Sequence, residues 1–124
     1  MPTTGSNFSE ESDFSVVTEH VGDVPVLRVR GEIDLDTAPT LESAIEGAAP
    51  LEQLVVLDFT DVSFMDSSGL SVLAQCHQRF TSPDGSTRLR LVVTRPSLLR
   101  IFDVTGLAEV FDVFATVDDA SRGR

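Results

Sequence analysis

The chain has 124 residues, 41% of them hydrophobic, with one cysteine and a formal net charge of −11. This length fits one domain with one core, and a lone cysteine excludes an intramolecular disulfide and suits a reducing compartment. All nine basic residues are arginine, so a P-loop lysine, a Schiff base and a lysine general base are excluded. A surface with this much negative charge repels nucleic acid and anionic lipid, and it suits a protein partner with a basic patch.

The sequence pattern favours neither a membrane span nor a secretory signal. No apolar run approaches the roughly 20 residues of a membrane span, and residues 1–13 lack a basic region followed by an apolar stretch. We therefore expect a cytoplasmic protein. Its domain is expected over residues 14–120, after a disordered acidic segment at 1–13 and before a flexible tail at 121–124.

Strand and helix signals alternate along the first half of the chain. Apolar alternation predicts strands over 14–21 and 25–30, and the second has one apolar and one polar side, as in antiparallel or edge strands. A loop is expected over 31–35. Thr37 is then expected to cap a helix. The apolar residues of that helix follow at helical spacing, at Leu41, Ala44, Ile45 and Ala48.

The second half continues the alternation. A continuous apolar run predicts a central strand over 53–59, buried on both faces, and a helix is expected from Ser67 to about Phe80. The remaining expected elements are a loop over 81–86, a strand over 88–94, a helix from Pro96 to Gly106, a strand over 109–114 and a small helix from Thr116. This order of elements predicts an α/β fold.

Two adjacent serines open the predicted second helix, in the sequence Asp66, Ser67, Ser68, Gly69. Asp66 is a good N-cap, and both hydroxyls lie near unpaired N–H groups at the positive end of the helix dipole, where a phosphate is stabilised. Helical projection places Ser68 above Ser71, opposite the apolar arc, so we expect Ser68 to be the more accessible serine. The same residues also fit an ordinary helix start with no further role.

Three segments together resemble the STAS domain family, and specifically the bacterial anti-sigma factor antagonists. They are 31–39, 56–70 and 99–107, and the middle one, which contains the serine pair, is the most specific. The resemblance covers roughly residues 14–120 and implies a mixed four- to five-stranded sheet with helices mainly on one face. The sequence departs from the family in its longer lead-in, its longer loop at 81–87 and its lack of lysine.

The resemblance also implies a function, that of a switch without catalytic activity of its own. The unphosphorylated protein would bind an anti-sigma factor that is itself a serine kinase, and would thereby release the sigma factor. Phosphorylation on Ser68, with Ser67 as the second choice, would end that binding, and a phosphatase would reset it. No cofactor, metal, nucleic acid or membrane is implied, and we expect a monomer or weak dimer. The partner surface would comprise Asp34, Asp66, Ser67, Ser68, Gly69 and Ser71.

Other assignments fit parts of the same sequence. A non-catalytic STAS subunit of a larger complex, in stress signalling or lipid transport, has the same fold, and a nucleotide hydrolase is the enzymatic alternative. The carboxylates of Asp58, Asp61 and Asp66 suggest a metal site, but a polar loop with a helix cap accounts for them better. His77 falls within an apolar arc and is expected to be packed, and Cys76 is expected to be a small core residue.

Overall fold

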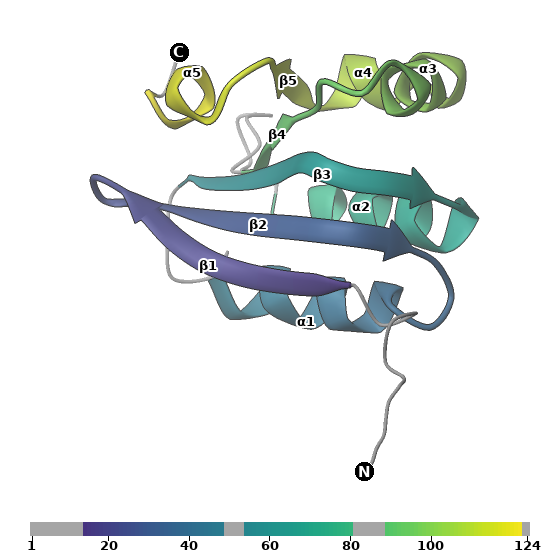
Figure 1. Ribbon diagram of the computed structural model, residues 1–124, viewed down its shortest axis with the longest axis horizontal. Helices are drawn as coiled ribbons and strands as arrows, with labels where there is room; N and C mark the ends of the chain where they lie inside the picture. Colours follow the sequence, from purple (N-terminus) through teal and green to yellow (C-terminus); the bar gives the residue numbers. More distant parts are fainter. Residues whose placement is uncertain (1–13, 49–53, 81–88, 123–124) are drawn as a thin grey trace, which may run out of the picture.

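The computed structural model describes residues 14–48, 54–80 and 89–122, which form a five-stranded sheet with helices around it (Figure 1). The strands lie side by side in chain order. The first two are antiparallel and the others run parallel. They are β1 (Ser15–Val21), β2 (Val24–Ile33), β3 (Val55–Met65), β4 (Leu89–Val92) and β5 (Asp112–Phe114). The expectation of a mixed α/β sheet is confirmed.

Helices connect the parallel strands, because a parallel pair cannot be joined by a tight turn. α1 (Ala38–Ala48) links β2 to β3, and α2 (Ser67–Arg79) links β3 to β4. α3 (Pro96–Thr105) and α4 (Leu107–Val110) together link β4 to β5. The chain then forms α5 (Val117–Ser121), the small helix expected from Thr116. The hydroxyl of Thr116 caps this helix by accepting from the N–H of Asp119. In Figure 1, α1 and α2 lie behind the sheet.

The main core lies between one face of the sheet and helices α1, α2 and α3. Its most deeply buried members come from strands and helices alike, and include Leu27, Leu57, Leu91, Leu41, Leu73 and Phe102. A smaller cluster on the other face joins Val26, Val56 and Val92 to Ala120 of α5. The central run of β3 is therefore buried on both faces, as expected, and most helices cover one face.

Several predicted boundaries are wrong, mainly because strand pairing continues past the apolar runs. β2 includes the first part of the expected loop at 31–35, because Gly31 pairs with Val62 and Ile33 with Met65. β3 likewise extends beyond the predicted 53–59. The expected strand at 109–114 begins as a helical turn, and only its end is β5. The predictions for 1–13 and 81–86 lie outside the described residues.

The third helix begins and ends where the sequence predicts, because its terminal residues have backbones suited to a helix start and a helix end. Pro96 is its first residue, where a missing N–H costs nothing. Gly106 follows the last residue with φ of 83°, a left-handed conformation that favours glycine. The N–H of Gly106 donates to the carbonyl of Asp103. The same glycine precedes α4, so the chain turns there without entering a strand.

Cys76 is fully buried on α2, as the sequence predicts. Burial, assisted by the carboxylate of Glu42, raises the pKa of its thiol to about 11. The chain contains no tyrosine and no lysine, so this thiol is the one side chain that ionises between about pH 9 and pH 11.

The free energy of unfolding should therefore fall with pH in that window. Below about pH 9 the thiol is protonated in both states, and stability is full. Above it the unfolded chain loses the proton first, which favours unfolding by about 2 kcal/mol at pH 11. Urea unfolding at intervals between pH 8 and pH 11 measures the effect. Cys76→Ala should show a flatter profile, and an equal slope in both proteins would contradict this assignment.

Candidate functional site

The predicted switch residues lie at the end of the sheet where β2 and β3 end and α2 begins. Asp66 is the N-cap of α2, with its Oδ1 accepting from the Ser68 N–H at 2.8 Å. Its own N–H donates to the carbonyl of Ile33 at 3.1 Å, which ties the helix start to the end of β2. The predicted capping role is confirmed, and it places the serine turn beside the β2–α1 loop.

The exposure of the two serines differs from the expectation. Ser67 is exposed and Ser68 is half-buried, so the prediction that Ser68 is the more accessible serine is wrong. The projection considered neighbours on the helix alone, whereas the end of β2 packs against this turn. Further along α2 the projection holds, because Ser71 is exposed and Leu73 is fully buried. Ser68 thus has a side chain that is partly covered but still reachable.

Gly69 allows the close approach between α2 and the two strands. A Cβ built on it would lie 2.5 Å from Cγ of Met65 and 2.7 Å from Cγ2 of Ile33. Separations under 3 Å force neighbouring atoms to move. Gly69 is buried inside the serine turn, so the structure gives it a positioning role, in which it lets the turn lie against β2, and its place in the partner surface stays a prediction.

The loop between β2 and α1 is held by its own hydrogen bonds. Oδ1 of Asp34 accepts from the N–H groups of Asp36 at 3.0 Å and Thr37 at 3.1 Å. Oγ1 of Thr37 accepts from the N–H of Asp34 and donates to the carbonyl of Glu32, each at 2.8 Å. The expected cap at Thr37 is thus corrected: its hydroxyl bonds back into the loop, and Asp34 supplies the side-chain acceptor at this helix start.

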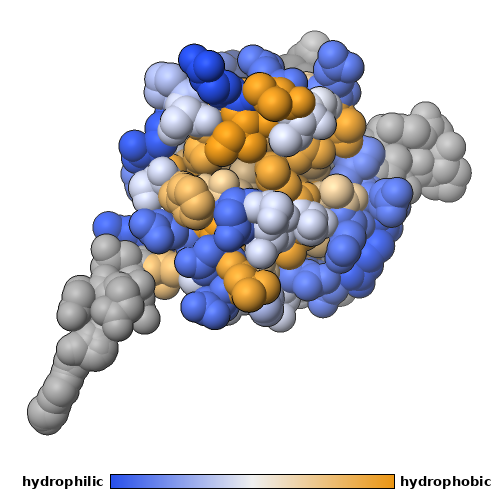
Figure 2. All heavy atoms as spheres, turned by 90° about the vertical axis from the view of Figure 1, so that its right-hand side faces the viewer, coloured by the Kyte–Doolittle hydropathy of each residue, from blue (hydrophilic) through white to orange (hydrophobic). Residues whose placement is uncertain are grey.

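Two large apolar side chains stand exposed at the same end of the molecule. Leu35 in the loop is 76% exposed, and Phe64 near the end of β3 is 47% exposed. Figure 2 views this end and shows orange apolar groups among blue polar ones. Sequence reasoning missed both residues, because each sits in a motif whose polar residues carried the resemblance. An apolar residue between two aspartates in a short loop was the available signal.

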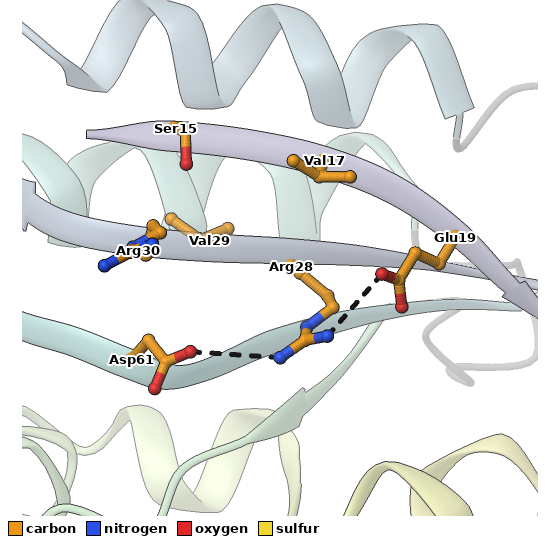
Figure 3. Close-up of a pocket in the computed structure, with 7 residues that line it drawn as sticks. All are labelled: Ser15, Val17, Glu19, Arg28, Val29, Arg30 and Asp61. Atoms are coloured by element: carbon orange, nitrogen blue, oxygen red, sulfur yellow. Dashed lines mark ion pairs between the residues drawn. The ribbon is translucent and has the colours of Figure 1, made fainter. Parts of the chain in front are cut away.

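A separate groove lies over β1, β2 and β3, and its charges are mostly paired (Figure 3). Arg28 lies 3.5 Å from Glu19, 3.7 Å from Asp58 and 3.9 Å from Asp61. Oδ1 of the buried Asp58 also accepts from Thr60 at 2.6 Å. Asp58 and Asp61 are thus engaged with an arginine, away from the N-cap Asp66. Within the described ranges, no three potential metal-binding side chains come together.

His77 is half-buried and packs edge-on against Phe111, with ring centroids 5.2 Å apart. The interplanar angle is 70°, a favourable aromatic geometry. The expectation of a packed histidine is confirmed. Its position on the buried side of α2 gives it no part in the serine turn.

Comparison with known proteins identifies the family. The STAS domain model matches residues 15–120. The anti-sigma-F factor antagonist RsfB of Mycobacterium tuberculosis is 36% identical over 108 residues, covering 86% of this chain and 85% of that protein. The anti-sigma-B factor antagonist of Bacillus subtilis is 33% identical over 99 residues, covering 80% and 88%.

Solved structures give the same result. The crystal structure of an anti-sigma factor antagonist from Mycobacterium paratuberculosis superposes with a TM-score of 0.80 at 31% identity, covering 90% of this chain and 93% of that one. Unphosphorylated SpoIIAA, at 23% identity and a TM-score of 0.69, shares the fold. Among the helices of the described ranges, none is long and apolar enough to cross a membrane. With the family model matching most of its length, this chain belongs to the STAS domain family.

Proposed function

We propose that this chain is an anti-sigma factor antagonist whose binding is switched by phosphorylation. In the unphosphorylated form it binds a cytoplasmic anti-sigma factor with serine kinase activity, and the sigma factor is released. Phosphorylation of Ser68 ends the binding, and a phosphatase restores it. Two relatives at 33% and 36% identity carry that name, and each matches at least 80% of this chain.

One observation carries the proposal: the serine turn is tied to the β2–α1 loop at one end of the sheet. The link is the hydrogen bond between Asp66 N–H and the Ile33 carbonyl, next to the loop held by Asp34. A partner that covers this end therefore meets both elements at once. The chain's role is to present a hydroxyl, and the chemistry belongs to the partner's active site.

The charges at this end account for a switch that acts on binding. A phosphate adds about −1.5 to −2 charges. On Ser68 it would lie beside Asp66, whose carboxylate already takes the Ser68 N–H. In the free protein the helix start and water accommodate that charge. Beneath a closely fitting partner, the same charge is desolvated beside carboxylates, which costs affinity.

The site is tested by incubating the chain with its anti-sigma factor and ATP, followed by mass spectrometry of the peptides. Ser68→Ala should abolish phosphorylation, while Ser67→Ala should leave most of it. Because Ser67 is the more exposed serine, the second variant is the matched control. Undiminished phosphorylation of Ser68→Ala, together with loss in Ser67→Ala, would move the site to Ser67.

A further inference from the structure

The hydrogen bonds of the β2–α1 loop separate the roles of its neighbouring residues. Oδ1 of Asp34 accepts from the N–H groups of Asp36 and Thr37, and the side chain is half-buried. Its backbone carbonyl accepts as well, from the N–H of Ala38 at 2.8 Å. Asp34 is therefore engaged within the loop, as an N-cap is, and is poorly placed to act as a free surface charge.

The bonded loop leaves the side chain of Leu35 exposed to solvent. At 76% exposed, it is the most exposed large apolar side chain of the described ranges after Val104. Its loop follows Ile33, whose carbonyl accepts from the N–H of Asp66. The end of the loop is held by the bond from the Ala38 N–H to the Asp34 carbonyl. A leucine this exposed has no stabilising role in the free protein, since apolar burial is what makes leucine favourable. Held in a fixed loop, it would bind with little additional loss of conformational entropy.

We propose that Leu35 is the main apolar contact of this chain with the anti-sigma factor, and that Asp34 is a positioning residue that holds it outward. This inference rests on the proposed function and names the contact by which it operates. The partner surface that fits is an apolar pocket bordered by basic side chains. The basic border follows from charge complementarity, because the exposed Glu32 and Asp36 flank the loop.

The test measures the affinity of unphosphorylated variants for the purified anti-sigma factor by isothermal titration calorimetry at 0.15 M salt. Leu35→Ala should weaken binding roughly tenfold to thirtyfold, which is the loss of affinity expected when most of a leucine side chain is no longer buried. Val104→Ala is the matched control, because Val104 is 80% exposed at the end of α3, and should change affinity less than about threefold.

Two substitutions at Asp34 distinguish positioning from direct charge recognition. Asp34→Asn keeps the Oδ1 acceptor and should bind within about threefold of wild type, whereas Asp34→Ala loses the loop bonds and should bind about tenfold more weakly. Asp36→Asn removes a neighbouring charge without touching those bonds. Circular dichroism melting verifies that each variant is folded.

Each outcome has a distinct meaning. If wild type does not bind the anti-sigma factor, the proposed function fails. If wild type binds and Leu35→Ala binds equally well, the apolar contact is wrong while the proposed function stands. If Asp34→Asn loses as much affinity as Asp34→Ala, the partner recognises the charge itself, and the positioning role is wrong.

Discussion

Phosphorylation of Ser68 is expected to weaken binding of the anti-sigma factor at least about 100-fold. That factor corresponds to roughly 2.8 kcal/mol, and removing a charged group from water without a matched partner costs several kcal/mol. The new charge lies beside Asp66, which already accepts from the Ser68 N–H at 2.8 Å. The phosphate and the Asp66 carboxylate would therefore compete for this one donor. Titration of the partner with phosphorylated and unmodified protein measures the ratio.

A comparison of mimetic variants shows whether the position of the charge matters. Ser68→Asp should weaken binding by at least tenfold, less than the phosphate because it adds only one charge. Ser67→Asp places the same charge on the exposed neighbour, where more water remains, and should have a smaller effect. Both variants should melt near the wild-type temperature, because negative charge in a first helical turn is tolerated. Unchanged affinity of the phosphorylated protein would overturn the charge mechanism.

Replacing Gly69 by valine is expected to destabilise the fold by about 3 kcal/mol, near the top of the range for overpacking. Even the Cβ would come within 2.5 Å of Met65 and 2.7 Å of Ile33, and valine adds two further carbons. The thioether of Met65 can rotate, but Cγ2 of Ile33 belongs to a buried, branched side chain in β2. The serine turn would have to separate from the sheet. Urea unfolding followed by circular dichroism measures the loss.

Gly47 provides the control for this substitution. It lies on α1, and a Cβ built there meets no atom within 4 Å. Gly47→Val should therefore be neutral or stabilising by a few tenths of a kcal/mol, since glycine is the poorer helix former. Because Gly69 also positions the serines, Gly69→Val should bind the anti-sigma factor more weakly even where it is folded. Equal stability of the two variants would show that the contact at Gly69 is not tight.

Local rules predicted those parts of the fold that depend on neighbours in the chain. The cap at Asp66 and the limits of α3 at Pro96 and Gly106 follow from backbone chemistry that operates within a few residues. The central strand was found because an apolar run of this length needs cover on both faces. The extension of this strand to Met65 is not visible in the sequence, because the residues after Phe59 are held by pairing with β2, which is distant along the chain.

The candidate site shows the same division. The serine pair could be located from the helix-start pattern, but the partial burial of Ser68 could not, because helical projection considers only neighbours on the same helix. In the sequence Leu35 is one more residue of a polar loop, and only the structure shows that its side chain is 76% exposed in a loop held by bonds between Asp34 and Thr37. The exposure of a side chain is set by its tertiary neighbours, and these are hardest to predict from the sequence where loops meet.

The most direct test of the account is whether this chain displaces a sigma factor from its anti-sigma factor. The preformed complex is titrated with unmodified protein and, separately, with protein phosphorylated on Ser68, and free sigma factor is measured by fluorescence anisotropy. The account predicts release by the unmodified protein at concentrations at least about 100-fold lower than by the phosphorylated form. Equal release by both forms, or no release by either, would contradict it.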